Sequence, residues 1–176
     1  MRFKKAELDV RTRYIADLEK SLTTYFKDYR NEQKSIIESL LKGHDTVVRL
    51  RTGGGKSLCF QAPAIISQGV TIVISPLQAL CNDQVDNFNK KYCTEAVTEF
   101  NKKYAEAHPE CAGFLSDKMP KAEFDLSVSK LVKNNNDDNT ECKLLYLSPE
   151  MLNKPVYRQE LIEAVASGKL KISMII

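Results

Sequence analysis

The chain is poor in the cysteine patterns that mark disulfide scaffolds and zinc sites. It has five cysteines, an odd number, and no Cys-x-x-Cys pair. Small secreted scaffolds use even, closely spaced cysteines, and structural zinc sites use paired ones. We therefore expect reduced thiols in the cytosol or nucleus at the five positions, Cys59, Cys81, Cys93, Cys111 and Cys142.

Long apolar runs and a strong charge of one sign are also missing. No stretch approaches the roughly 18 apolar residues of a membrane span. The first residues, Met1 to Lys5, lead into charged positions, so we expect no signal peptide, no secretion and no membrane partner. The net charge of +3 is too mild to indicate nucleic-acid binding by itself. The 176 residues, 43% of them hydrophobic, suffice for a sizeable core.

Glycine is scarce but concentrated at one place. Three of the seven glycines, Gly53, Gly54 and Gly55, are adjacent and are followed by Lys56 and Ser57. The β-branched and apolar run 46–51 before them predicts a strand, and the apolar residues after them predict a helix. A tight turn with an exposed lysine is the simpler alternative, but it does not need three glycines and Lys-Ser.

A strand, a glycine loop and a helix that begins at Lys-Ser form a cradle for phosphate. Glycines let backbone N–H groups surround an anion, and the helix N-terminus adds partial positive charge. Lys56 supplies a full charge, and the Ser57 hydroxyl can ligate Mg²⁺. The strict motif has glycine where this chain has Leu50, so the match is a relaxed one.

Periodicity predicts helices alternating with strands along the rest of the chain. Asn31 is expected to cap the second helix and Gly43 to end it, while Pro63 should kink or shorten the helix after the glycine loop. This alternation predicts an α/β sandwich with a parallel sheet. The expected helices are 6–26, 31–42, 56 onward, 77–88 and 157–167, and the expected strands are 46–51, 70–75, 112–115, 143–148 and 170–176.

The middle of the chain is less regular. The segment Phe88-Asn89-Lys90-Lys91-Tyr92 recurs at 100–104. Solvated lysines beside core aromatics are the favoured interpretation, and a contact to single-stranded nucleic acid is the alternative. The run 133–140 is rich in Asn and Asp and is expected to be a disordered loop.

Four blocks in order narrow the interpretation to a family. They are Tyr29-Arg30-Asn31-Glu32-Gln33, the loop with its continuation 56–64, the segment 73–85 with Ser75-Pro76-Leu77, and the segment 144–150 with Ser148-Pro149-Glu150. Together they resemble the N-terminal half of a RecQ-type superfamily-2 DNA helicase. The resemblance covers about residues 22–176, apart from an expanded region between Phe88 and Asn139.

The resemblance implies a P-loop NTPase fold of the RecA-like type and a set of site residues. Arg30 and Gln33 match the motif that reads adenine; an ordinary first-turn helix residue is the alternative for Gln33. ATP and Mg²⁺ are implied at the loop, with Lys56 catalytic and Ser57 holding the metal. The implied ATP-binding residues are Arg30, Gln33, Thr52, Gly53, Gly54, Gly55, Lys56 and Ser57.

The two strand-end blocks match motifs that track one DNA strand in such helicases. Ligands bind at the carboxyl ends of parallel strands, where hydroxyls and backbone N–H groups can hold phosphates. Simple proline-terminated strands are the alternative. The implied nucleic-acid contacts are Ser75, Pro76, Leu77, Ser148, Pro149 and Glu150.

Some family features are absent from the sequence. Arg51 stands where the family usually has proline, and Gln78-Ala79 replaces a commoner polar pair. The chain has no Asp-Glu dipeptide, and its final apolar run stops where the family continues into Asp-Glu-Ala-His. The acidic pair and the second lobe with its arginine finger are needed for phosphoryl transfer, so this chain alone is expected to be inactive as an ATPase.

We therefore expect the ATP- and DNA-binding part of a RecQ-like 3′–5′ DNA helicase acting on single strands or forked duplexes in repair and recombination. The expected location is the nucleus, or the cytoplasm of a prokaryote. Residues 1–24 are expected to form a helical segment and 25–176 a partial helicase ATP-binding domain, partly disordered at about 88–140. A non-hydrolysing ATP- or nucleic-acid-binding module and an RNA-helicase fragment are the alternatives.

Overall fold

The computed structural model describes residues 30–67, 69–92, 112–133 and 142–176. The chain forms two compact units, one ending at Ser67 and the other comprising the remainder, and each is described by itself. The predicted helix 6–26, the second copy of the repeat at 100–104 and almost all of the polar loop 133–140 lie outside the described residues. No helix among the described residues is long and apolar enough to cross a membrane.

The first unit is built on two packed helices, α2 (Asn31–Leu41) and α3 (Lys56–Ile66). Ile37 and Leu41 of α2 are buried as predicted. The predicted cap at Asn31 is wrong, because Asn31 is already the first residue of the helix and Arg30 is its N-cap residue. Gln33 takes the place of a capping side chain, since its Oε1 accepts the Arg30 backbone N–H at 2.7 Å. Gly43, with φ 73°, follows the helix as predicted.

The strand predicted at 46–51 is wrong. Residues 44–51 are irregular, and no described strand pairs with them. β-branched residues favour a strand only where a neighbouring strand supplies hydrogen bonds and packing, and here Val47 is fully exposed. Helix α3 begins at Lys56 as predicted, continues three residues past Pro63 and ends at Ile66. The Pro63 carbonyl accepts the Ser67 N–H at 2.9 Å and closes the last turn.

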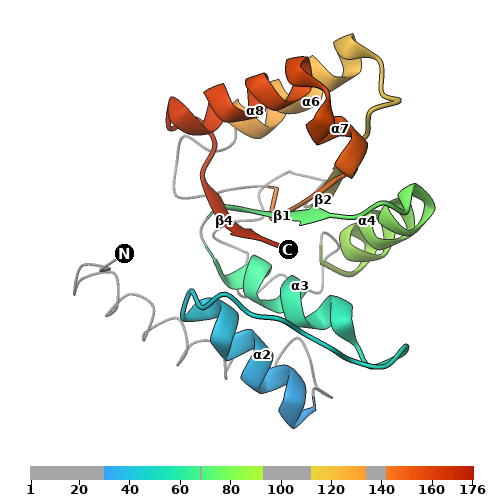
Figure 1. Cartoon of the computed structure of the whole chain (residues 1–176), viewed down its shortest axis with the longest axis vertical. Helices are drawn as coiled ribbons and strands as arrows, with labels where there is room; N and C mark the ends of the chain where they lie inside the picture. The colour runs from blue at the N-terminus through green and yellow to red at the C-terminus, as the bar shows by residue number, and fades with distance from the viewer. Residues whose placement is uncertain (1–29, 68, 93–111, 134–141) are drawn as a thin grey trace. The chain divides into compact units, whose positions relative to one another are not determined.

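The second unit contains a four-stranded parallel sheet in the order β2-β3-β1-β4 (Figure 1). The predicted α/β class and parallel sheet are confirmed. The central strands read as continuous apolar runs because both of their faces are covered. The strands are β1 (Val70–Ile74), β2 (Ala112–Leu115), β3 (Leu144–Leu147) and β4 (Ile172–Ile175).

Helices cover both faces of this sheet. On one face lie α6 (Lys121–Lys133), α7 (Pro149–Asn153) and α8 (Pro155–Ala166), and on the other lies α4 (Gln78–Tyr92) (Figure 1). Asn89 of α4 is hydrogen-bonded to the Ala112 N–H and carbonyl of β2, at 2.8 and 3.1 Å. Helices α4 and α8 confirm predictions within a few residues, while α6 and the short α7 were not predicted.

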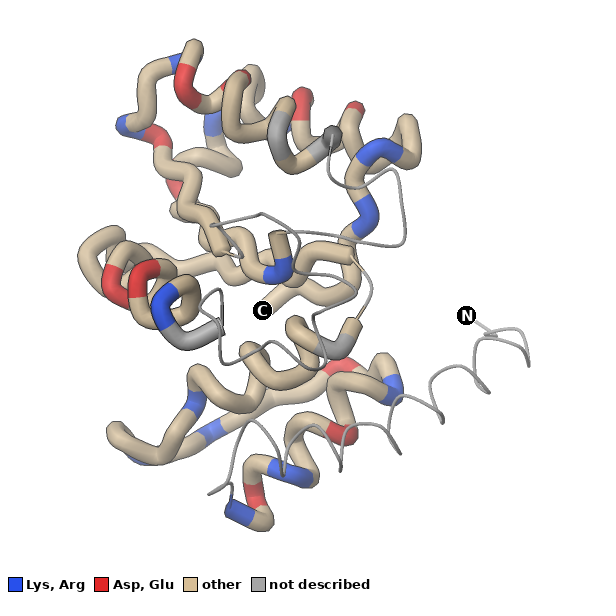
Figure 2. Tube along the Cα trace, turned by 180° about the vertical axis from the view of Figure 1, so that it is seen from behind, with Lys and Arg blue, Asp and Glu red and all other residues tan. Residues whose placement is uncertain are grey.

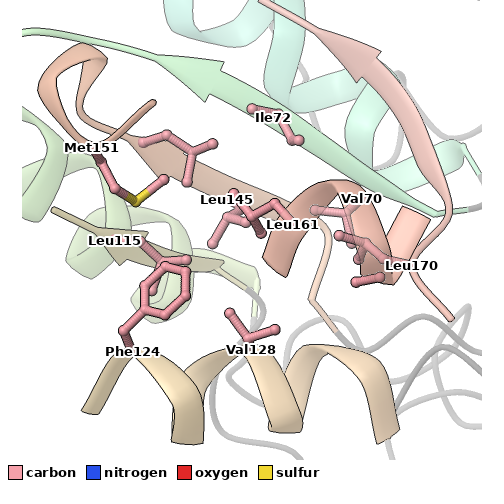
Figure 3. Close-up of a cluster of buried hydrophobic side chains, with 11 residues drawn as sticks. Val70, Ile72, Leu115, Phe124, Val128, Leu145, Met151, Leu161 and Leu170 are labelled. Atoms are coloured by element: carbon pink, nitrogen blue, oxygen red, sulfur yellow. The ribbon is translucent and has the colours of Figure 1, made fainter. Parts of the chain in front are cut away.

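A buried apolar cluster packs the strands against α6, α7 and α8 (Figure 3). Alternate residues of β1 (Val70, Ile72) and of β3 (Leu145, Leu147) face it, which is the two-residue period of strands. Phe124 and Val128 stand four residues apart on α6 and so lie on the same face of that helix, while Met151 and Leu161 come from α7 and α8. This core fixes where the carboxyl ends of the strands lie. Its members are Val70, Ile72, Leu115, Phe124, Val128, Leu145, Leu147, Met151, Leu161, Ala164 and Leu170.

Candidate nucleotide-binding site and strand-end motifs

The glycine loop of the first unit has a backbone that requires glycine. Gly53 and Gly55 have φ of 74° and 76°, in the left-handed region that other residues rarely adopt. A Cβ on Gly54 would lie 2.8 Å from the Arg51 carbonyl oxygen, and one on Gly55 would collide with the Gln33 amide. The Gly54 N–H donates to that Arg51 carbonyl at 2.9 Å. The three adjacent glycines are therefore explained by tight loop geometry.

The charged and hydroxyl groups of the cradle stand at the start of α3. Lys56 is the first residue of the helix and is exposed, and its Nζ donates to the Arg51 carbonyl at 3.0 Å. Ser57, half-buried, follows in the first turn, and Thr52 is exposed on the loop. A flexible lysine, a hydroxyl and the N-terminus of an 11-residue helix thus converge at one end of α3. These residues fit a phosphate group with its Mg²⁺.

Gln33 connects α2 to the glycine loop. Its side chain is 5% exposed, and its Nε2 donates to the carbonyls of Gly54 and Gly55 at 3.5 and 3.2 Å. The same amide accepts from the Arg30 backbone. A buried polar side chain with three backbone partners holds its neighbours in register. The Gln33 side chain thus joins the start of α2, at the Arg30 backbone, to the glycine loop.

Cys59 lies one turn into α3, and its Sγ is 3.7 Å from the Gly55 carbonyl oxygen. Burial raises the pKa of the Cys59 thiol above its ordinary value. The thiol is therefore protonated near neutral pH and belongs to the packing of the helix. Among the described residues, no group of three or more His, Cys, Asp or Glu side chains could hold a metal ion.

In the second unit, the two predicted motifs follow adjacent strands. Ser75 comes directly after β1 and donates its N–H to the Leu147 carbonyl at 3.0 Å. Pro76 is exposed, and Leu77 is 61% exposed just before α4. Leu77 accepts the Cys81 N–H at 3.0 Å and so belongs to the first turn of that helix.

Ser148 is placed differently from Ser75. It is fully buried as the N-cap of α7, and its Oγ accepts the Met151 N–H at 3.2 Å and the Asp117 N–H at 3.4 Å. Its hydroxyl is therefore committed to the fold. The exposed member of this motif is Glu150, with Pro149 half-buried beside it. Any ligand contact by this motif would run through these two residues and the backbone.

Sequence reasoning missed the turn that follows β2. Ser116 directly follows this strand as Ser75 and Ser148 follow theirs, and the turn 116–120 is bonded to the motif at 148–150. The signal was present, because a serine directly follows the predicted strand 112–115. Its significance depended on the order of the strands, which the sequence did not show.

Comparison with known proteins agrees with this arrangement. Residues 30–172 match the DEAD/DEAH box helicase family. The chain is 34% identical over 133 residues to an ATP-dependent DNA helicase RecQ of Synechocystis, covering 75% of this chain and 23% of that protein. It is 36% identical over 132 residues to the helicase hus2/rqh1 of Schizosaccharomyces pombe, covering 73% of this chain and 8% of that protein.

A shorter match is closer in sequence. Over 59 residues, 34% of this chain, it is 56% identical to the RecQ-like DNA helicase blm-1 of Caenorhabditis elegans, covering 6% of that protein. The chain spans less than a quarter of the length of these relatives. The family match includes the glycine loop, the strands β1, β2 and β3, and the first residue of β4. The chain belongs to the DEAD/DEAH box helicase family, with a RecA-like fold and RecQ-type relatives.

Proposed function

We propose that this chain is the ATP- and DNA-binding part of a RecQ-like, ATP-dependent DNA helicase. The observation that carries the proposal is the cradle formed by Gly53–Gly55, Lys56 and Ser57 at the N-terminus of α3, with Gln33 bonded to it. The names of the relatives support ATP as the nucleotide and DNA as the polymer. Movement 3′ to 5′, a role in repair and recombination, single-stranded or forked DNA and a nuclear location are parts of the same proposal.

The residues of the first unit have distinct roles in nucleotide binding. Loop N–H groups and the Lys56 ammonium bind the phosphates, and the lysine exchanges the Arg51 carbonyl for phosphate oxygens. The Ser57 hydroxyl would hold Mg²⁺, which supplies positive charge to the phosphate oxygens when bound. Gln33, with Arg30 beside it, would read the base edge by exchanging the Gly54 and Gly55 carbonyls for the base, since an amide can donate and accept at once.

Titration calorimetry of the chain with Mg-ATP tests the phosphate assignment. Lys56→Ala should lower the affinity about 10- to 100-fold, because a hydrogen bond to a charged group contributes roughly 1.5–3 kcal/mol. Lys42→Ala is the matched control in the same unit, because Lys42 follows the C-terminal end of α2, away from Gln33 and the glycine loop, and forms a surface ion pair with Glu38. Equal ATP affinity in the wild type and Lys56→Ala would refute the cradle.

Competition by GTP tests the base assignment separately. A site amide left without its partner costs roughly 1–3 kcal/mol, so GTP should compete poorly with ATP. Tripolyphosphate, which has no base, is the control ligand: Gln33→Ala should remove the preference for ATP over GTP without abolishing tripolyphosphate binding. If GTP competes as well as ATP for the wild type, Gln33 does not recognise the base. The phosphate-binding role of Lys56 would still stand.

A further inference from the structure

Three neighbouring strands of the sheet end in register, and a serine directly follows each of them. Leu147 of β3 is in register with Ile74 of β1 on one side and with Leu115 of β2 on the other. The next residues are Ser148, Ser75 and Ser116. Because the strands are parallel, three turns leave the sheet side by side at its carboxyl edge, where ligands of open α/β sheets bind. Two of these turns carry the predicted DNA motifs, and the third, 116–120, has no assigned role.

The third turn is joined directly to the motif after β3. The Asp117 N–H donates to Ser148 Oγ at 3.4 Å, and the Ser148 N–H donates to the Leu115 carbonyl at 3.2 Å. Lys154, at the junction of α7 and α8, donates to the Asp117 carbonyl at 2.7 Å. The turn and the motif at 148–150 therefore form one braced piece of structure.

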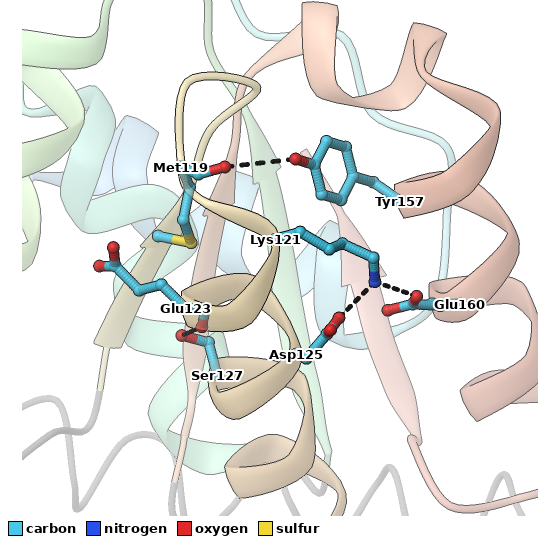
Figure 4. A network of polar contacts seen from close by, with 7 residues as sticks. All are labelled: Met119, Lys121, Glu123, Asp125, Ser127, Tyr157 and Glu160. Atoms are coloured by element: carbon cyan, nitrogen blue, oxygen red, sulfur yellow. Dashed lines mark hydrogen bonds and ion pairs between the residues drawn. The ribbon is translucent and has the colours of Figure 1, made fainter.

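The far side of the turn is held by α8 (Figure 4). Tyr157 Oη donates to the Met119 carbonyl at 3.2 Å, and its ring lies 4.5 Å from that of Phe124. Lys121, which follows the turn, is bonded to Asp125 on its own helix and to Glu160 on α8. The backbone of the turn is thus held at both ends. The Cα position of a residue at its tip is therefore well defined.

The tip of the turn presents one positive charge. The Asp117 carboxylate lies 3.8 Å from Lys154 Nζ and is paired with it. Lys118 is exposed and takes part in none of the hydrogen bonds or ion pairs of the described residues. Basic and acidic positions are interspersed along the described elements, with no continuous basic stripe (Figure 2). Among the described residues of the turn 116–120, Lys118 is therefore the cation left available to an anionic ligand.

We propose that Lys118 is a third strand-end contact to nucleic acid and binds a backbone phosphate beside the motifs at 75–77 and 148–150. The inference rests on the proposed DNA-binding function and adds a site to it. An ammonium on a flexible stem binds phosphate as a point charge and carries no base preference. The contact would therefore fix the position of the strand without selecting its sequence.

Fluorescence anisotropy with a labelled oligothymidine strand tests this on the full chain. Losing one phosphate contact on a single strand reduces the slope of log K against log salt by about 0.7. Lys118→Ala should therefore lower the affinity about fivefold at roughly 0.1 M salt and flatten the slope by that amount. Lys118→Arg, which keeps the charge, should retain wild-type binding. Lys169→Ala is the control, because Lys169 is exposed and precedes β4, at the amino edge of the sheet.

The outcomes separate this inference from the function on which it rests. Wild-type binding that is unchanged in Lys118→Ala, in both affinity and salt slope, overturns the role of Lys118 and leaves DNA binding standing. An equal loss in Lys169→Ala also overturns it, because the effect would then be one of net charge. No binding by the wild type overturns the proposed DNA-binding function and this inference with it. Circular dichroism confirms that each variant is folded.

Discussion

The two units of the chain reach their functional geometry in different ways. In the first, the cradle is set mainly by neighbours in sequence, namely glycines with φ near 75° and a lysine that donates to a carbonyl five residues earlier, with Gln33 of α2 bonded to the loop. In the second, the strand-end turns are set by a core of eleven residues drawn from seven elements and connections. The phosphate cradle depends on residue type at fixed positions, whereas the geometry of the sheet edge depends on packing between distant segments.

The same difference separates the two serines that end β1 and β3. Ser75 is half-buried beside an exposed Pro76 and Leu77, whereas Ser148 is fully buried and caps α7. Both have the sequence Ser-Pro after an apolar strand. The resemblance assigns both to DNA, but their hydroxyls stand in different environments. A hydroxyl that already accepts two backbone N–H groups serves first to hold the turn.

The largest expected effect is the loss of core packing in the second unit. Phe124 is fully buried, so Phe124→Ala should lower the free energy of unfolding by about 3–5 kcal/mol. Leu126→Ala is the matched control on the same helix, because Leu126 is 56% exposed, and it should cost far less. Urea denaturation followed by circular dichroism measures both. Similar midpoints for the two variants would show that the cluster in Figure 3 does not stabilise the unit.

A substitution in the cradle should act on the ligand as well as on stability. Gly55→Ala places a methyl group against the Gln33 amide at a positive φ, a strain of roughly 1–3 kcal/mol. Gly168→Ala is the matched control, because Gly168 has φ 73° and no neighbour within 4 Å of an added Cβ. Both should unfold more easily, but only Gly55→Ala should lose ATP affinity in titration calorimetry. Equal ATP affinity in the two would separate Gly55 from nucleotide binding.

The sequence predicted the features that depend on neighbouring residues better than those that depend on distant segments. The loop, Lys56, Ser57 and the start of α3 were predictable because glycine geometry and helix-terminus chemistry are local. The parallel sheet was predictable from apolar runs, since strands buried on both faces cannot alternate. The failure at 46–51 has the opposite cause: residues such as Val47 and Val48 favour a strand, but a strand also needs a hydrogen-bonded neighbour.

The turn at 116–120 and helix α6 show what non-local information adds. Phe124 and Val128 have helical spacing, but a short mixed segment beside a proline did not stand out among the surrounding polar residues. The relation of Ser116 to Ser148 came only from the order β2-β3-β1, because β2 and β3 are separated by about 30 residues in the chain. The pairing of β2 with β3 brings together two turns that are distant in the sequence.

The Ser148 hydroxyl should contribute a smaller amount to stability. Removing an N-cap hydroxyl typically costs about 1 kcal/mol. Ser148→Ala should therefore lower the free energy of unfolding by about that amount, and Ser129→Ala, which removes an exposed serine from α6, should change it little. Urea denaturation compares them. No difference between the two would mean that the cap and the bond to Asp117 do not stabilise the turn.

The smallest effect is expected at the Lys121 contact between α6 and α8. Hydrogen bonds to Asp125 and Glu160 raise the pKa of Lys121 above its ordinary value. A raised pKa in the folded state means that the stabilisation is complete at pH below the ordinary lysine value and is lost as the pH rises through the folded value. The melting temperature of Lys121→Met should lie slightly below that of the wild type by a constant amount between pH 7 and pH 9.

This gap should close only at more alkaline pH. Lys169→Met is the control variant, because Lys169 is exposed in the connection before β4. A gap that already disappears between pH 7 and pH 9 would show that the lysine charge does not hold the two helices together. Differential scanning fluorimetry across pH measures the gap for both variants.

The division of roles between the units is tested most directly by measuring both ligands on the same two variants. Mg-ATP and oligothymidine affinities would be determined for the wild type, Lys56→Ala and Lys118→Glu. The account predicts that Lys56→Ala loses most ATP affinity and keeps DNA binding in the absence of nucleotide, while Lys118→Glu loses DNA affinity and keeps ATP binding. Loss of both ligands in either folded variant, or loss of neither in both variants, would contradict it.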